Sequence, residues 1–156
     1  MMENIKILQE YDELRKSQIV AEVLSDLPEW FGLPESTQAY IEEAHKLPLW
    51  YAGREGEALG FITLTHTSPD TAEIHCMGVK KALHRAGLGT LLYQSLEDFA
   101  RNDYKYIQVK TVDEGHYQEY DQTIAFYKNM GFSKLEVFPT LWDPWNPCLL
   151  MIKALK

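Results

Sequence analysis

The sequence predicts an α/β fold in which helices cover both faces of a mixed, mostly antiparallel central sheet. Three observations support this prediction. Three strand-like segments joined by turns lie between residues 48 and 79, a helix, a strand and a second helix follow them, and two strand-like segments come last. A meander followed by such an alternation is typical of a mixed sheet with helices on both sides. The predicted order of elements is β-α-α-β-β-β-α-β-α-β-β.

The first half of the chain is expected to form a short strand, two helices and a three-stranded meander. Apolar residues recur at helical spacing within residues 11–24, at Leu14, Ile19, Val20, Val23 and Leu24. Pro34 suits the start of a second helix, which Ser36 or Thr37 would cap and which would reach about His45. Apolar and β-branched runs bounded by turn residues predict strands around Ile5 and Ile7 and at residues 48–53, 58–66 and 71–79.

The second half is expected to alternate helices and strands. An apolar stripe at helical spacing runs from Leu88 toward Asn102, through Leu91, Leu92, Leu96 and Phe99. Another helix, at residues 117–130, would end at Gly131, because glycine suits the left-handed conformation that follows many helices. Strands are expected at residues 106–112, 132–138 and 148–155, with a loop over residues 139–147.

Length, charge and cysteine content limit the class of protein. The 156 residues, of which 46% are hydrophobic, suffice for one domain with its own core, expected to span residues 1–156. A net charge of −8 argues against nucleic acid or a membrane surface as partner, because both select basic proteins. No apolar run approaches the about 20 residues of a spanning helix, and the first residues lack a basic flank and an apolar core, so export is not expected. Cys76 and Cys148 lack metal-like spacing, so we expect free, buried thiols, no metal and a cytoplasmic protein.

Residues 80–90, with the sequence KKALHRAGLGT, form the most informative segment. Basic residues and two glycines lie between a predicted strand and a predicted helix. The N terminus of a helix offers unpaired amides and a positive dipole end, and glycine lets an anion approach the backbone. The segment therefore predicts a phosphate or pyrophosphate site, although a solvated basic loop before a helix remains the alternative. Neither the GxxxxGK[ST] motif nor a complete GxGxxG motif is present.

Two motifs resemble the GNAT N-acetyltransferase superfamily, whose order of elements also matches the predicted one. The first is the acyl-CoA motif [QR]-x-x-G-x-[GA], here His84-Arg85-Ala86-Gly87-Leu88-Gly89. The second is an aromatic pair followed three residues later by Gly-Phe, here at residues 126–132. The chain departs from the family pattern at His84, where Gln or Arg is usual, and at Tyr120 and Thr123, where Asn and Ala are frequent.

The resemblance implies acetyl-CoA as cosubstrate and a role for each matching residue. The pyrophosphate would be bound by Thr90 and by the backbone amides of His84, Arg85, Ala86, Gly87, Leu88 and Gly89. Backbone groups of Met77 and Val79 would pair with the pantetheine arm like an added strand, and an amide near Met77 would polarise the thioester carbonyl. Tyr127 would bind the cofactor and protonate the departing thiolate; a core aromatic role is the alternative.

An amine acceptor also requires a base, because an alkylamine with a pKa of about 10 is mostly protonated at neutral pH. Strand alternation is expected to place Glu73, His75 and Met77 on one face, and Ile74 and Cys76 on the other. Glu73 occupies the position where several GNAT members carry a catalytic glutamate, so the resemblance favours Glu73, with His75 as the alternative. Each also has a structural reading, Glu73 as a solvated carboxylate and His75 as a core histidine. Cys76, on the opposite face, is not expected to act as a nucleophile.

The acceptor is expected to be a small, cationic amine or polyamine that attacks the thioester of acetyl-CoA directly, without a covalent enzyme intermediate. Three segments combine aromatic residues with carboxylates, which suits a cation: residues 27–31, 112–121 and 139–146. The tryptophans among them would otherwise only pack a loop or, through Trp142 or Trp145, serve a homodimer interface. The competing functions are a non-catalytic acyl-CoA sensor with the same fold and a structural protein that binds no CoA.

Overall fold

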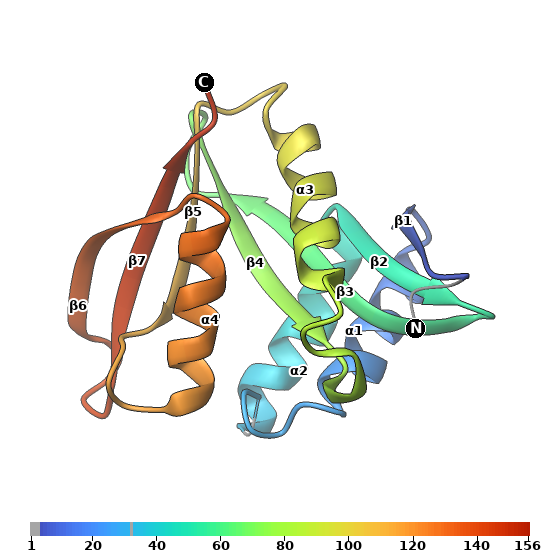
Figure 1. Cartoon of the computed structure of the whole chain (residues 1–156), viewed down its shortest axis with the longest axis horizontal. Coiled ribbons are helices and arrows are strands. Elements are labelled where there is room, and N and C mark those ends of the chain that lie inside the picture. The colour runs from blue at the N-terminus through green and yellow to red at the C-terminus, as the bar shows by residue number, and fades with distance from the viewer. Residues whose placement is uncertain (1–3, 32) are drawn as a thin grey trace. The chain divides into compact units, whose positions relative to one another are not determined.

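A computed structural model describes residues 4–31 and 33–156 of the chain (Figure 1). Within these residues it contains seven strands, four α-helices and two short 3-10 helices. The elements are, in order, β1 (Lys6–Glu10), α1 (Glu13–Leu24), α2 (Pro34–Glu43), η1 (Ala44–Lys46), β2 (Leu49–Arg54), β3 (Glu57–His66), β4 (Thr71–Val79), η2 (Lys81–Leu83), α3 (Leu88–Ala100), β5 (Tyr106–Val112), α4 (Gln118–Asn129), β6 (Ser133–Asp143) and β7 (Asn146–Ala154).

The strands form one sheet in the order β1-β2-β3-β4-β5-β7-β6. The pairs β1–β2, β2–β3, β5–β7 and β6–β7 are antiparallel, whereas β4 and β5 are parallel. The predicted mixed, mostly antiparallel sheet is therefore confirmed. The β4–β5 ladder begins at Thr71–Tyr106 and ends at Glu73–Gln108, so it involves only the start of β4.

The chain divides into two compact units, and β4 contributes residues to both. The first unit comprises Met1–Thr65 and His75–Phe99, and the second comprises His66–Ile74 and Ala100–Lys156. The first unit holds the strand-to-helix loop at residues 80–88, and the second holds Glu73 and Tyr127.

In the first unit, helices cover both faces of the sheet (Figure 1). Helix α1 buries one apolar stripe, including Ile19 and Val23, against Leu49 and Phe61 of the sheet. Leu88 at the start of α3 packs on the other face in a second cluster of buried residues. Burying one such side chain contributes about 1.5–3 kcal/mol, so these two layers hold α1 and α3 on opposite faces.

In the second unit, helix α4 packs against a sheet of β5, β7 and β6. Ile124 and Tyr127 are its buried residues. At the end of the helix, the Lys153 ammonium of β7 donates a hydrogen bond to the Met130 carbonyl at 2.8 Å. Gly131 follows with a φ of 102°, the left-handed conformation that the sequence predicted for it.

Element types were predicted correctly, but several boundaries differ. Helix α1 starts at Glu13 rather than Tyr11, because the Asp12 carboxylate accepts a hydrogen bond from the Arg15 amide and caps the helix. Leu14 does not belong to the buried stripe, since it is 69% exposed. Neither Ser36 nor Thr37 caps α2, because Leu33 is the N-cap residue and Pro34 opens the helix.

The loop predicted at residues 139–147 is wrong, because β6 continues to Asp143 and β7 begins at Asn146. Three prolines in this segment favour a loop when the sequence is considered alone. Strand β6 lies at the edge of the sheet, where a proline costs no ladder hydrogen bond, so Pro139 is tolerated inside it. The turn itself is short, and the Asp143 carboxylate accepts hydrogen bonds from the Trp145 and Asn146 amides at 2.9 and 3.0 Å.

Candidate active site

The loop between β4 and α3 turns sharply before the helix begins. Arg85 and Gly87 have φ values of 66° and 86°, in the left-handed region that glycine adopts without strain. A Cβ atom added at Gly87 would meet no heavy atom within 4 Å, so open space lies on that side of the loop. The backbone at Gly87 is therefore accessible to a bulky group.

The first turn of α3 supplies amides suited to an anion. The first helical hydrogen bond runs from the Leu91 amide to the Gly87 carbonyl at 3.3 Å. The amides of Leu88, Gly89 and Thr90 precede it, and helical geometry gives such amides no intrahelical acceptor. This arrangement fits a phosphate or pyrophosphate, because the amides and the helix dipole both favour negative charge.

The lysines that precede the loop are engaged by carboxylates. The Lys80 ammonium lies 2.8 Å from Glu22 and 3.1 Å from Glu57. Lys81 pairs with Glu29 at 3.3 Å, and its amide donates to the Asp26 carboxylate at 2.7 Å. The two lysines therefore anchor the end of β4 to neighbouring elements of the first unit.

His84 and Arg85 are both exposed beside the predicted phosphate site. The His84 ring packs edge-on against Trp30 with centroids 5.4 Å apart, and its Nε2 lies 2.6 Å from the Val79 carbonyl oxygen. His84 thus fixes the loop to the last residue of β4.

Glu73 lies in a cluster of polar groups in the second unit. Its carboxylate accepts a hydrogen bond from the side-chain amide of Gln108 at 2.6 Å and lies 3.1 Å from the Lys110 ammonium. Its side chain is 14% exposed. The reading of Glu73 as a solvated edge carboxylate is therefore not supported, because the group is mostly covered and held by two donors.

His75 lies in a separate polar network in the first unit. Its Nε2 is 2.8 Å from the carboxylate of Glu43, at the end of α2, and its Nδ1 is 3.4 Å from the hydroxyl of Thr63 on β3. The Tyr40 ring packs edge-on against the imidazole with centroids 5.2 Å apart. The side chain of His75 is 14% exposed and that of Glu43 is 58% exposed, so one end of this network reaches solvent.

Burial alternates along β4 as the sequence predicts: Ile74 and Cys76 are buried, whereas Glu73, His75 and Met77 are partly buried. Cys76 belongs to the buried cluster of α1. His75 contacts Glu43 and Tyr40 of α2.

Tyr127 is buried in α4, with 6% of its surface exposed. Its ring packs edge-on against Phe126 at 5.5 Å and Phe132 at 5.7 Å between centroids. The Phe132 amide also donates to the Tyr127 carbonyl at 3.0 Å. These contacts fix the ring firmly, as both the acid role and the core role require.

Both cysteines are free and buried, as predicted. Burial raises the pKa of the Cys76 thiol, and it raises the pKa of the Cys148 thiol to about 11. A thiol with a raised pKa holds little thiolate at neutral pH. Cys76 is therefore a poor nucleophile, because it lies on the buried face of β4.

The segments expected to bind the acceptor differ in their exposure. Leu27 is a buried core residue, and Trp30 and Phe31 pack against the same cluster, so this segment has a structural role. Trp142 and Trp145 are 47% and 75% exposed in the β6–β7 hairpin, as a surface for a ligand or a partner requires.

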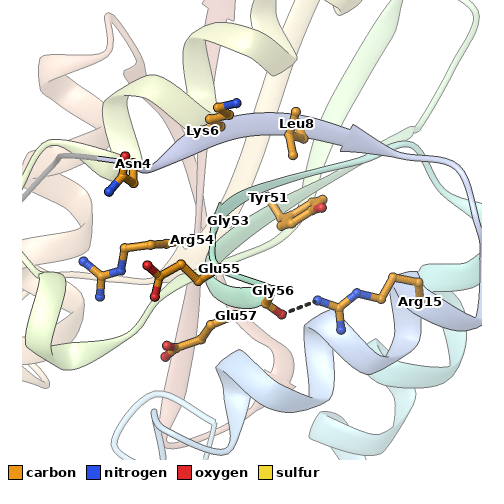
Figure 2. Close-up of a pocket in the computed structure, with 10 residues that line it drawn as sticks. All are labelled: Asn4, Lys6, Leu8, Arg15, Tyr51, Gly53, Arg54, Glu55, Gly56 and Glu57. Atoms are coloured by element: carbon orange, nitrogen blue, oxygen red, sulfur yellow. Dashed lines mark hydrogen bonds between the residues drawn. The ribbon is translucent and has the colours of Figure 1, made fainter.

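A hollow beside the β2–β3 hairpin lies apart from the predicted site residues (Figure 2). It is lined by Asn4, Lys6, Leu8, Arg15, Tyr51, Gly53, Arg54, Glu55, Gly56 and Glu57. The Arg15 guanidinium donates to the Gly56 carbonyl across it at 3.4 Å. None of the residues predicted for the cofactor or for catalysis lines this hollow.

Within residues 4–31 and 33–156, no three His, Cys, Asp or Glu side chains gather as metal ligands would. No helix in that part of the chain has the length and apolar character to cross a membrane.

Comparison with known proteins identifies the family. The acetyltransferase (GNAT) family model matches residues 11–132, so this chain belongs to that family. The N-alpha-acetyltransferase RimI of Mycobacterium tuberculosis is 33% identical over 76 residues, which are 49% of this chain and 44% of RimI. The chain thus spans less than half the length of this curated relative.

Solved structures support the same fold. A putative GNAT acetyltransferase from Desulfovibrio desulfuricans superposes with a TM-score of 0.81 at 15% identity, covering 97% of this chain and 99% of that one. An aminoglycoside 6'-N-acetyltransferase complexed with coenzyme A superposes with a TM-score of 0.74 at 19% identity and covers 97% of both chains. The predicted fold and family are therefore confirmed.

Proposed function

We propose that this protein is an N-acetyltransferase that transfers the acetyl group of acetyl-CoA to the primary amine of a small, cationic acceptor. The observation that carries the proposal is the loop before α3, where an exposed glycine backbone leads into the first turn of a helix. The coenzyme A complex of a structurally similar protein supports the choice of cosubstrate. The proposed acyltransferase domain spans residues 1–156.

Each matching residue is proposed to keep the role that the resemblance implies. The amides from His84 to Gly89, with the Thr90 hydroxyl, bind the pyrophosphate, and the backbone of Met77 and Val79 binds the pantetheine arm. The amine attacks the thioester carbonyl directly, and Tyr127 protonates the thiolate that leaves. No covalent enzyme intermediate forms, which agrees with the buried thiols of both cysteines.

The acceptor is proposed from chemistry rather than from a defined pocket. The protein carries a net charge of −8, which attracts a cationic acceptor and lowers the affinity for an anionic one. Exposed Trp142 and Trp145 offer aromatic faces for a cation. A similar fold in an aminoglycoside acetyltransferase is compatible with such an acceptor.

The acceptor class is tested with a panel of small amines, amino acids and peptides, by measuring thiol release together with the acetylated product. We expect product with cationic primary amines, and we expect the rate to fall as salt increases because attraction of the cation is screened. Acetylation of amino acids or peptides without any acetylation of amines would contradict the proposed acceptor. Binding of acetyl-CoA without product from any acceptor would favour the alternative, an acyl-CoA sensor.

Replacing Glu73 with glutamine tests the base that the family resemblance favours. If Glu73 takes the proton of the acceptor, Glu73→Gln lowers kcat about 100-fold or more and leaves the affinity for acetyl-CoA unchanged. The matched control is Glu136→Gln, which removes an exposed carboxylate from the same unit. Unchanged turnover of Glu73→Gln between pH 6 and 9 removes Glu73 from the mechanism and leaves His75.

We also propose a cellular location and an assembly state for the protein. A cytoplasmic location and action without a metal, nucleic acid or membrane agree with the acidic sequence. If the β6–β7 hairpin does not bind the acceptor, its exposed Leu141, Trp142 and Trp145 are proposed to form a homodimer interface instead. Light scattering of Trp145→Ser beside the wild type tests it, and identical masses would exclude this hairpin as the interface.

A further inference from the structure

The polar cluster around Glu73 contains a primary amine to which the proposed roles assign no function. The Lys110 ammonium lies 3.1 Å from the carboxylate of Glu73, the residue that the family resemblance favours as the base. We propose that Lys110 is itself an acceptor, so that the protein acetylates this side chain when acetyl-CoA is bound and no other amine is present. This inference rests on the proposed function, because it uses the same cosubstrate and the same base.

The register of β5 places Lys110 just past the point where this strand stops pairing with β4. The β4–β5 ladder ends at Glu73–Gln108, whereas the pairing of β5 with β7 continues to the end of β5. Lys110 follows Gln108 by two residues, so both side chains leave the same face of β5. Both side chains also contact the Glu73 carboxylate, which agrees with this placement.

The ammonium of Lys110 becomes a nucleophile once it has lost a proton. It has three protons and no lone pair, and the proton directed at Glu73 is the one that a base in this position removes. Rotation about the Cε–Nζ bond then turns the new lone pair away from the carboxylate. The side chain of Lys110 is 36% exposed and that of Glu73 is 14% exposed, so the lysine is the more open partner of this ion pair.

Proximity to the base distinguishes Lys110 from other lysines of the same unit. Lys105 is also paired with a carboxylate, since its ammonium lies 3.9 Å from Asp70, but its side chain is 65% exposed. Chemical acetylation by free acetyl-CoA would favour the more exposed Lys105. Acetylation that depends on Glu73 favours Lys110, because an amine held beside its base reacts as if it were highly concentrated.

Cys148 is the other nucleophile near this ion pair, and it is less suited to accept the acetyl group. It is fully buried, and burial raises the pKa of its thiol to about 11. A thiol with such a pKa holds little thiolate at neutral pH. An acetyl group on Lys110 is an amide and resists hydroxylamine, whereas a thioester on Cys148 is cleaved, so the two products are easily distinguished.

The atoms and protons of the step balance. Lys110 gives one ammonium proton to Glu73, and the neutral amine attacks the acetyl carbon of acetyl-CoA. The bond between nitrogen and that carbon forms, and the bond from the carbon to the CoA sulfur breaks. Tyr127 protonates the thiolate and regains a proton from the nitrogen, and Glu73 returns its proton to solvent. The products are acetyllysine, coenzyme A and one proton.

The test incubates the full chain with ¹³C-labelled acetyl-CoA in the absence of any acceptor amine and locates the label by peptide mass spectrometry. We expect Lys110 to gain the label about 100-fold faster than Lys105, because only Lys110 is held beside the base. The rate constant should not change when the protein is diluted, as a step within one molecule requires. Equal labelling of the two lysines, or labelling that slows on dilution, would overturn the inference.

Four variants test whether the ion pair with Glu73 causes the reaction. Lys110→Arg keeps the cation but replaces the amine with a guanidinium that stays protonated, so this variant should gain no acetyl group at residue 110. The control Lys105→Arg should keep the label on Lys110.

Glu73→Gln should slow labelling of Lys110 about 100-fold, and Glu136→Gln, which removes an exposed carboxylate, should leave it unchanged. Unlabelled acetyl groups that Lys110 acquired before purification are added to the labelled ones for every variant. Wild-type occupancy of Lys110 in Glu73→Gln would overturn the inference.

Failure of this inference can be distinguished from failure of the proposed function. If the wild type acetylates external amines and Lys110 stays unmodified, the function stands and this inference is wrong. If neither external amines nor Lys110 are acetylated, both are wrong. If Lys110 is acetylated and no external amine is, the inference stands and the proposed acceptor is wrong.

Discussion

Replacing Gly89 with aspartate is expected to abolish the stabilisation of this protein by acetyl-CoA. Gly89 is the second residue of α3, in the turn whose amides are proposed to bind the pyrophosphate. A carboxylate about 4 Å from a phosphate charge costs roughly 4 kcal/mol near a protein surface, enough to weaken binding more than about 100-fold. The added side chain would also hinder the approach of a phosphate to the helix N terminus, which adds to that cost.

The measurement is the melting temperature with and without acetyl-CoA. A ligand at about 100 times its dissociation constant stabilises the folded state by about 2.7 kcal/mol, so the wild type should melt at a clearly higher temperature. Gln94→Asp is the control, since it adds the same charge at an exposed position on the same helix. An equal shift in Gly89→Asp and the wild type would show that the pyrophosphate lies elsewhere.

Replacing Tyr127 with phenylalanine is expected to lower kcat about 100-fold while the KM for acetyl-CoA changes little. The substitution removes only the hydroxyl, so the ring contacts with Phe126 and Phe132 are kept. Without an acid, the thiolate must leave as an anion, and the loss should therefore shrink for a thioester whose thiol is more acidic.

Tyr93→Phe is the matched control for Tyr127→Phe. Tyr93 is also buried, and its hydroxyl donates to Glu97 at 2.7 Å, so its loss affects stability without touching the proposed site. We expect Tyr93→Phe to have a lower melting temperature than the wild type and to keep the wild-type kcat. If Tyr127→Phe is also less stable but keeps its kcat, Tyr127 is a core residue, as in the alternative interpretation.

Local signals in the sequence were sufficient for most of the fold. The helical stripe of α3 places Leu88, Leu92 and Leu96 in the core as predicted, although Leu91 and Phe99 at its margins are 40% and 38% exposed. Gly131 ends α4 because glycine adopts the left-handed conformation that is found at this position. The loop predicted within β6 was wrong because proline indicates a loop unless the strand is known to lie at the edge of the sheet.

The network around His75 could not have been predicted from the sequence. Glu43 lies 32 residues and Thr63 12 residues from the histidine, and no spacing rule connects a helix end to strands so far along the chain. Alternation on β4 correctly separates partly buried His75 from buried Cys76, but it does not indicate which residues of other elements contact the ring. The motif at residues 84–89, by contrast, is local, so its loop and helix start were found from the sequence alone.

The central claim is that the loop before α3 binds the pyrophosphate of acetyl-CoA. The most direct measurement is a calorimetric titration of acetyl-CoA into the wild-type protein, beside coenzyme A without its acetyl group. We predict saturable binding of both ligands that weakens as salt is added, because the contacts to the pyrophosphate are electrostatic. Absence of binding at millimolar ligand would mean that residues 80–90 are only the start of a helix, and it would contradict the proposed function.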